Sequence, residues 1–444
     1  MGLTIFTQYL SFLSRSSDIA LFLAFLLCAS IASVGAQEQT TTLTDQQRNA
    51  IADLVTAHYW QPVGRDSVLK MLSVGGLDLL DQYSSYLSPA EWSEFKVNLG
   101  GSFGGIGIFI DQDSATRQFF VGGVFRNSPA HRAGIKRRDQ ISRVDGVSVH
   151  GLSIDEVFPK LRGLEGTTVV VELIRGKSGD TLTFTLQREE ITTPSVRGAQ
   201  VVEGSDRQFL LEGTEDIAYV RITNFSRTTA ADMDSALAAI ARLNVRGLIL
   251  DIRGNIGGLM KAALAVADMF LDSTVMITVK ERTEPDDVRL ATRGVQCALP
   301  VALLVDDSTV SSAEIFASAI QDNHRAVVIG RCSFGKGMIQ QLFALPDSAS
   351  GIKLTIAQYV RPSGRPIERH LSGFDPAQGG ICPDSGMSFD DSLEVVAKES
   401  AAIIHADRLW EFADIEIPKA SSATDRVIAR ACEVLRTHSG SKSK

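Results

Sequence analysis

Two adjacent serines are candidate nucleophiles for acyl transfer, in which a hydroxyl attacks a carbonyl carbon. The apolar run LPVALLV is followed by DSTVSSAEIFASAIQDNHRA, so Ser311 and Ser312 fall at the predicted start of a helix that ends near Asp322. A serine at that place faces the positive end of the helix dipole, which favours a developing oxyanion. Ser311-x-x-Glu314 is also the pattern of a capping box, so the spacing alone leaves a purely structural N-cap role open.

A lysine between two glycines is the candidate base for such a serine. The segment CSFGKGMIQ places Lys336 between Gly335 and Gly337. Lysine accepts a proton only when it is neutral, and burial achieves this by disfavouring the ammonium and lowering the pKa. No phosphate loop precedes this lysine, so a nucleotide site is not predicted. A competing Ser/His hydrolase would use a histidine such as His324, but no serine here lies in a G-x-S-x-G turn.

A glycine-rich strand start further upstream is suited to binding a carboxylate. The segment GGIGI, residues 104–108, places glycines just before and within a predicted strand. Backbone N–H groups exposed there could bind the carboxylate of a peptide terminus. The alternative interpretation is that these glycines only make turns.

The elements that would position these residues change in character along the chain. Helical spacing of apolar residues is followed by short β-rich runs such as TTVVVELI and DTLTFTLQ, and then by the buried strands GLILDIR, LPVALLV and AVVIG. Buried strands that alternate with helices indicate an α/β region. We therefore predict an N-terminal helical region at 37–96, a mostly-β module at 97–188, an α/β core at 189–384 with a linker and first strands at 189–215, and a helical extension at 385–444.

The composition excludes several classes of protein. Of the 444 residues 44% are hydrophobic and 22% charged, which is ordinary for a folded soluble chain. The net charge is -8 and the lysines and arginines are scattered, so nucleic acid is not predicted as a partner. The cysteines form no CxxC pair and no cluster with histidines, so a zinc site is not predicted. Acyl transfer by a serine and a lysine implies no metal and no other cofactor.

The first 36 residues have the pattern of an export signal. Arg15 precedes the apolar stretch Ile19–Val34, and V-G-A ends at Ala36 before a polar segment. We predict cleavage after Ala36, because the apolar stretch is shorter than the roughly 20 residues that span a bilayer. The alternative is an uncleaved signal that tethers the protein to the membrane through residues 19–34. Both alternatives predict an exported protein, periplasmic or otherwise extracytoplasmic.

Four cysteines follow the predicted signal: Cys297, Cys332, Cys382 and Cys432. Disulfides are compatible with an oxidising compartment. Spacing alone does not determine which cysteines would pair, so no disulfide is assigned.

The order of five segments resembles the carboxyl-terminal processing peptidases, the S41 serine peptidases also called tail-specific proteases. The segments are DIRGNIGG, SSAEIFASAIQDNHRA, FGKGMIQ, LTIAQYVRPSGRPI and GGICPD. The likeness covers about residues 45–384, including DQYSSYLS ahead of the β module, and Asn127–Gly146 is similar to a block of PDZ domains. The resemblance implies a multidomain α/β fold: a crotonase/ClpP-like α/β protease core, an inserted mostly-β PDZ domain and an N-terminal helical segment.

Carried over by position, the resemblance implies a role for each candidate residue. Ser311 would be the nucleophile and Lys336 the general base, and Gln340 would hold the lysine in place. The backbone N–H groups of Ser312 and Gly257 would form the oxyanion hole. Two residues depart from the family pattern: Ser312 replaces the usual alanine and so becomes an alternative nucleophile, and Ile256 replaces the usual proline.

The resemblance also implies how a substrate would be recognised. PDZ domains bind an extended carboxyl-terminal peptide as an added strand, and Gly105, Ile106, Gly107 and Ile108 match their carboxylate-binding loop. We expect a serine endopeptidase that cleaves proteins near their C-termini, with apolar tails as substrates and an activating adaptor protein as a further partner. The alternatives are an inactive or ligand-binding protein of the same fold and a pure PDZ adaptor.

Overall fold

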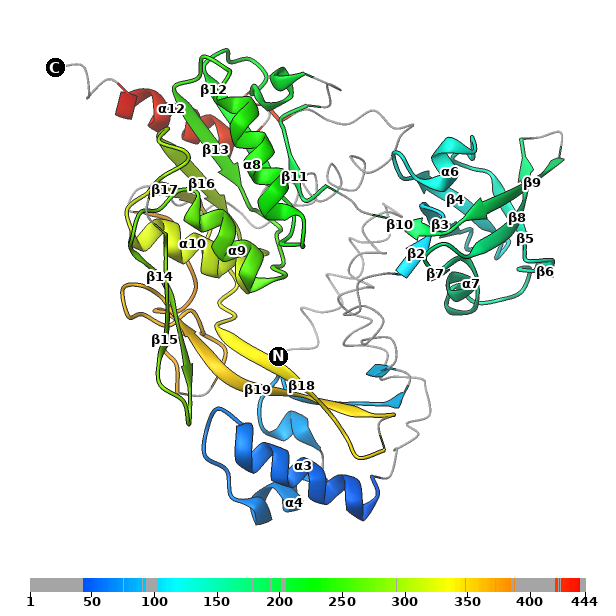
Figure 1. The fold of residues 1–444 in the computed structure, drawn as a ribbon, viewed down its shortest axis with the longest axis horizontal. Coiled ribbons are helices and arrows are strands. Elements are labelled where there is room, and N and C mark those ends of the chain that lie inside the picture. The colour runs from blue at the N-terminus through cyan, green and yellow to red at the C-terminus, as the bar shows by residue number, and fades with distance from the viewer. Residues whose placement is uncertain are drawn as a thin grey trace, which may run out of the picture. The chain divides into compact units, whose positions relative to one another are not determined.

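The computed structural model describes most of the chain after the predicted signal (Figure 1). The described residues are 43–92, 103–384, 387 and 420–439, without 75, 90, 177–178, 192–193, 201–204, 293, 348, 372, 422 and 424. The predicted signal at 1–36, the tether at 19–34 and most of the predicted extension at 385–444 lie outside them. No helix in the described ranges is long and apolar enough to cross a bilayer.

A five-stranded sheet forms the centre of the α/β core. Its strands, in spatial order, are β11 (Val196–Arg197), β12 (Ile217–Ile222), β13 (Gly247–Asp251), β16 (Val301–Val305) and β17 (Ala326–Gly330). The four strands from β12 to β17 are parallel, and β11 is an antiparallel edge strand. Every residue of β12, β13 and β16 is buried, which explains their near-continuous apolar sequences.

Helices cover both faces of this sheet (Figure 1). Alternate strand residues pack on one side against α8 (Thr229–Ile240), α9 (Met260–Asp268) and α10 (Ser312–Asp322), and on the other against α12 (Arg426–Ser439). Because parallel strands present their carboxyl ends at one edge, the loops after β13 and β16 emerge side by side.

A second, antiparallel sheet carries the residues that follow the candidate lysine. It contains β1 (Ser85–Leu87), β14 (Val275–Glu281), β15 (Asp287–Leu290), β18 (Met338–Ala344) and β19 (Gly351–Val360). The N-terminal helices α3 (Asp45–His58) and α4 (Arg65–Val74) precede β1. The segment after α3 bonds to this sheet through Trp60 N–H and the Thr355 carbonyl at 3.1 Å. The predicted helical lead-in is therefore joined to the core by strand β1 and by this contact.

The mostly-β module has a core of its own. Its main sheet contains β3 (Ile108–Gln112), β4 (Phe119–Val124), β5 (Gln140–Val144), β8 (Thr168–Arg175) and β9 (Asp180–Gln187), with β6 (Val147–Ser148) paired to β5. The short strands β2 (Phe103–Gly105), β7 (Gly163–Leu164) and β10 (Glu189–Glu190) form a small second sheet, and the helices are α6 (Pro129–Arg132) and α7 (Ile154–Leu161). Among the described strands β3 pairs only with β4, so β3 is an edge strand.

A disulfide joins Cys332 to Cys382, a pairing that the spacing of the cysteines left open. Cys297 and Cys432 are buried free thiols. The two cysteines are 50 residues apart in the sequence. The bridge connects the segment just before Lys336 to the last described segment of the core, which contains Cys382.

Removal of this disulfide should destabilise the fold. We expect the double variant Cys332→Ala/Cys382→Ala to lose about 2–4 kcal/mol of free energy of unfolding, because the unfolded chain gains freedom. Denaturant titration with and without reductant measures the effect, and reductant should lower wild type to the level of the variant. Cys297→Ala keeps the bridge, so its midpoint should still fall with reductant. A wild-type midpoint that reductant leaves unchanged would contradict the assignment.

Candidate active site

Ser311 lies in a sharp turn between β16 and α10. It is the N-cap of α10, and its φ of 59° lies in the left-handed region, where a side chain is unfavourable. Strain of this kind costs about 1–3 kcal/mol and is often found at functional sites. A sharp strand-to-helix turn is also how α/β-hydrolases present their nucleophile. The turn is therefore present without the G-x-S-x-G sequence that would have predicted it.

The Glu314 carboxylate links this turn to the loop of the candidate lysine. Its Oε2 accepts the N–H of Ser311 at 2.8 Å and that of Lys336 at 2.9 Å. Its Oε1 accepts the Gly335 N–H at 2.5 Å and the Ser333 hydroxyl at 2.6 Å. Because two backbone nitrogens bond to one oxygen, Ser311 and Lys336 are close neighbours. The predicted capping glutamate thus also holds a second loop.

Glu314 is fully buried, and burial raises its pKa. The four hydrogen bonds oppose that rise by favouring the charged form. A buried carboxylate is costly unless it is well bonded, so the four donors explain why this one is tolerated.

Lys336 has the surroundings that a lysine base needs. It is half-buried, and burial followed by the positive charge of Lys353 lowers the pKa of its ammonium group. The carboxylates of Glu368 and Glu314 act in the opposite direction. The net direction is a pKa below the ordinary lysine value, which increases the fraction of neutral amine at a given pH.

Gln340 lies in β18, opposite Thr355 of β19. Its Nε2 is buried and has no hydrogen-bond partner among the described residues. The expected hold of Gln340 on Lys336 stays a prediction.

Gly257 lies directly against the turn of Ser311. A Cβ at Gly257 would lie 2.8 Å from the Val310 carbonyl oxygen and 3.0 Å from Ser311 Cβ, and its φ is 102°, so only glycine fits. However, the Gly257 N–H donates to Asn255 Oδ1 at 2.8 Å. One of the two predicted oxyanion donors is therefore close to the serine but already has an acceptor.

The two departures from the family pattern have different surroundings. Ser312 is 1% exposed, and its hydroxyl has no hydrogen-bond partner in the described part of the chain. A hydroxyl so buried is poorly placed to attack a protein substrate, which favours Ser311 as the nucleophile. Ile256 is 73% exposed, so replacing the proline does not disturb the packing of the loop.

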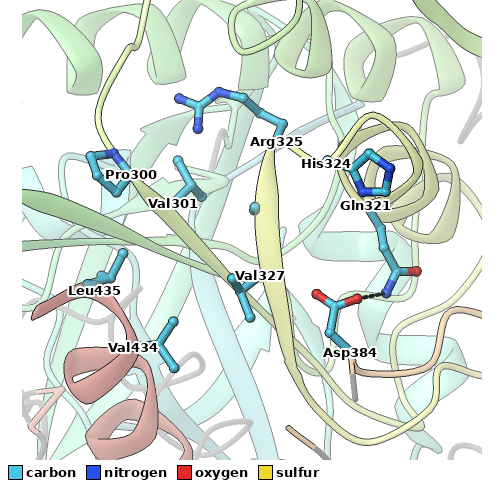
Figure 2. Close-up of a pocket in the computed structure, with 10 residues that line it drawn as sticks. Pro300, Val301, Gln321, His324, Arg325, Val327, Asp384, Val434 and Leu435 are labelled. Atoms are coloured by element: carbon cyan, nitrogen blue, oxygen red, sulfur yellow. Dashed lines mark hydrogen bonds between the residues drawn. The ribbon is translucent and has the colours of Figure 1, made fainter. Parts of the chain in front are cut away.

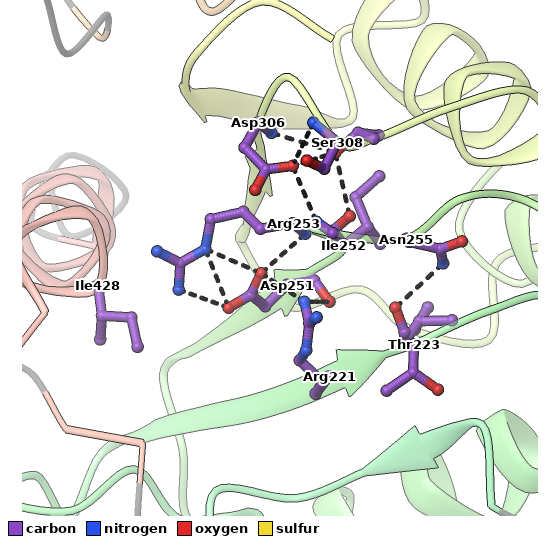
Figure 3. Close-up of polar contacts among 12 residues, drawn as sticks. Arg221, Thr223, Asp251, Ile252, Arg253, Asn255, Asp306, Ser308 and Ile428 are labelled. Carbon is purple, nitrogen blue, oxygen red and sulfur yellow. Dashed lines mark hydrogen bonds and ion pairs between the residues drawn. The ribbon is translucent and has the colours of Figure 1, made fainter. Parts of the chain in front are cut away.

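A buried charge network holds the loop that leads to Gly257 (Figure 3). The guanidinium of Arg253 contacts Asp251 at 2.6 Å, and Arg221 contacts the same carboxylate at 3.1 Å. Burial alone would raise the pKa of Asp251, but Arg253 and Arg221 hold it at about 2. Arg253 also pairs at 2.8 Å with Asp425, just before α12, and Asp306 accepts the Gly254 N–H at 2.8 Å. These ionic contacts fix the start of the loop.

In the mostly-β module, the four predicted ligand-binding residues form the connection between β2 and β3. Gly105 ends β2, Ile108 begins β3, and Ile106 is 2% exposed. Gly107 has a φ of 77°, and a Cβ there would lie 2.1 Å from Ser128 Cβ. The connection is thus held tightly beside α6 and leads into the edge strand, which can accept an added strand.

Figure 2 shows the residues that line a cavity of the core. It is lined by residues at the beginnings of β16 and β17, the end of α10 and α12, whereas Ser311 follows the other end of β16. Three of its polar side chains already have partners: Gln321 donates to Asp384 at 2.8 Å, and Arg325 donates to the carbonyls of Phe270, Cys297 and Leu299. No group of acidic, histidine and cysteine side chains suited to a metal occurs in the described residues.

Comparisons with known proteins define the class of this enzyme. The model of peptidase family S41 matches residues 216–385, and a PDZ domain model matches residues 120–188. The fold and these matches define a serine protease with a PDZ domain, and they confirm the α/β multidomain fold predicted from the sequence.

Curated relatives identify the family more closely. The carboxy-terminal processing protease CtpA of Bacillus subtilis (strain 168) is 31% identical over 338 residues, which are 76% of this chain and 69% of the relative. The carboxyl-terminal-processing protease of Synechocystis sp. is 32% identical over 294 residues, 66% of this chain and 67% of the relative. The solved photosystem II D1 C-terminal processing protease is 25% identical, with 85% of this chain and 100% of that chain covered at a TM-score of 0.46. The chain belongs to the carboxyl-terminal processing proteases of family S41.

A methyl group at Gly257 should disturb the site more than the fold. We expect Gly257→Ala to lower kcat at least about tenfold, because the new Cβ would press on the turn of Ser311. Gly294→Ala is a matched control, because Gly294 has a φ of 101° and open space around its Cβ position. Both substitutions place an alanine at a positive φ, so each should lower the free energy of unfolding by about 1 kcal/mol, which thermal melting measures. Equal kcat values for the two variants would argue against a role of Gly257 in the site.

Proposed function

We propose that this protease cuts proteins near their carboxyl termini with Ser311 as nucleophile and Lys336 as general base. The observation that supports this pair is the buried Glu314 carboxylate, which bonds the backbone N–H of both residues. The lowered pKa of Lys336 supports its role as the base. Neither residue needs a metal or another cofactor for this chemistry.

In the proposed reaction Lys336 Nζ takes the proton of Ser311 Oγ as that oxygen attacks the peptide carbonyl carbon. The resulting oxyanion would accept the N–H of Ser312, the first residue of α10, and that of Gly257 once Asn255 releases it. Lys336 then gives the proton to the leaving amine, and an acyl-enzyme forms. Lys336 then takes a proton from water as the water oxygen attacks the ester carbonyl, and it returns that proton to Ser311 Oγ as the bond to the acyl group breaks. Gln340 would keep the lysine directed at Ser311.

We further propose that the PDZ domain, with boundaries near 97 and 188, holds the substrate by its tail. The tail would add to β3 as a strand, with its carboxylate at Gly105, Ile106, Gly107 and Ile108. Apolar tails would suit this site. The predicted remaining domains, 37–96, 189–384 and 385–444, stand as proposals of the same kind.

Export of the protein fits the predicted signal at 1–36 and gains support from the Cys332–Cys382 disulfide. Disulfides persist in oxidising compartments and are rare in the cytosol. A periplasmic or otherwise extracytoplasmic location, an activating adaptor protein and a membrane tether at residues 19–34 stay predictions.

The dyad is tested by two substitutions. We expect Ser311→Ala and Lys336→Ala each to reduce cleavage of an unstructured protein with an apolar tail by at least about 10³-fold, because the nucleophile or its base is missing. Mass spectrometry of the fragments measures cleavage, and fluorescence anisotropy of a labelled tail peptide should show unchanged binding. Ser312→Ala is the control and should remain active. Retained cleavage by Ser311→Ala or Lys336→Ala would refute the dyad.

Tail binding is tested in the PDZ domain. We expect Gly107→Ala to raise KM for the tailed protein about tenfold or more, because the new Cβ meets Ser128 and displaces the loop. Cleavage of a short amidated peptide, which has no free carboxylate, should be unaffected. Gly134→Ala is a matched control in the same domain, with a φ of 79° and open space. If Gly107→Ala leaves KM unchanged for both substrates, the tail is held elsewhere.

A further inference from the structure

Two residues outside the proposed dyad contact the Lys336 loop. Glu368 is fully buried, and it accepts the Gly337 N–H at 3.0 Å through Oε2 and the His370 N–H at 2.8 Å through Oε1. The Tyr83 hydroxyl donates to Glu368 Oε1 at 3.2 Å. The centroid of the Tyr83 ring lies 5.5 Å from Lys336 Nζ. Tyr83 comes from the segment just before β1, so the N-terminal region of the chain contributes to this part of the site.

Two buried carboxylates therefore hold three consecutive backbone N–H groups. Glu314 accepts those of Gly335 and Lys336, and Glu368 accepts that of Gly337. A Cβ at Gly337 would lie 2.3 Å from the Glu368 nitrogen, so the two segments are in backbone contact. Burying a second carboxylate beside the same lysine is costly. Together the two carboxylates restrict the loop on both sides of Lys336.

We propose that Tyr83 and Glu368 are positioning residues that hold the Lys336 side chain for proton exchange with Ser311. The inference rests on the proposed role of Lys336 as the base. The ring of Tyr83 gives the ammonium a favourable face, and the bond to Glu368 fixes that ring. Burial, followed by the charge of Glu368, raises the pKa of Tyr83, so its hydroxyl stays a neutral donor.

Charged groups on several elements act on Lys336. Burial and Lys353 of β19 favour its neutral form, whereas Glu368 and Glu314 favour the ammonium. Loss of the Glu368 charge should therefore lower the Lys336 pKa, and loss of the Lys353 charge should raise it. Since the neutral amine is the active base, kcat/KM rises with pH through this pKa, and its acid limb follows the same shifts.

Two further basic residues lie on the loop after Glu368. The guanidinium of Arg369 donates to the Gly379 carbonyl at 2.6 Å. His370 Nε2 bonds to the Phe334 carbonyl at 2.7 Å. A His370→Asn variant removes this imidazole and so shows whether it contributes to the pH dependence of kcat/KM.

The pH dependence of kcat/KM for the full mature chain tests the proposal. Glu368→Gln should move the acid limb to lower pH by on the order of one unit, and Lys353→Met should move it to higher pH. Glu281→Gln, at the exposed end of β14, is the matched control and should not move the limb. The proposal would be overturned if the acid limb of Glu368→Gln coincided with that of Glu281→Gln or lay at higher pH.

Variants of Tyr83 keep the test decisive if Glu368→Gln fails to fold. Tyr83→Phe keeps the ring and should lower kcat several-fold at unchanged KM, and Tyr83→Leu, which also loses the ring, should lower it further. Wild-type kcat in Tyr83→Leu would refute the positioning role. The proposed function itself fails if Lys336→Ala still cleaves the substrate. If Lys336→Ala is inactive while the variants of Tyr83 and Glu368 resemble wild type, only this inference fails.

Discussion

Hydrogen bonds from two separate segments to one buried carboxylate are the constraint on which the geometry of the candidate site depends. Glu314 lies in the first turn of α10 and accepts the N–H of Ser311 at the start of its own helix. The same carboxylate bonds three donors of residues 333–336, which come from the connection between β17 and β18. Backbone movement of Ser311 or Lys336 would break a hydrogen bond to a fully buried carboxylate. One side chain of α10 thus positions the backbone of both the proposed nucleophile and the proposed base.

The parallel sheet supplies the remaining part of this constraint. The loops after β13 and β16 meet at one sheet edge, so Gly257 comes into contact with the turn of Ser311. The network of Asp251, Arg253 and Asp306 fixes the start of the first loop. Asp425 connects the same network to α12 on the far face of the sheet. The loop proposed to bind the oxyanion is therefore held at its start by buried ion pairs and a hydrogen bond, and at Gly257 by close backbone packing.

Local patterns predicted the elements well because they depend on neighbouring residues. The buried strands, the helix that begins after Ser311 and the separate β module all follow from apolar periodicity and turn residues. Contacts between distant segments could not be predicted in that way. The pairing of Cys332 with Cys382, the bond of the Gly257 N–H to Asn255 and the contact of Tyr83 with Glu368 each depend on the folded backbone. The second role of Glu314 was hidden, because a capping box already explained its spacing.

The surroundings of Lys336 combine two opposed requirements. Carboxylates are the strongest acceptors for backbone N–H groups, so they suit a loop that must be held rigidly. Their negative charges also stabilise the ammonium, which is the inactive form of a lysine base. Burial and the charge of Lys353 outweigh that effect here, and the net direction of the pKa is downward. A peptide that covers the half-buried amine would remove water from it and lower its pKa further, which favours the neutral form that the proposed base needs.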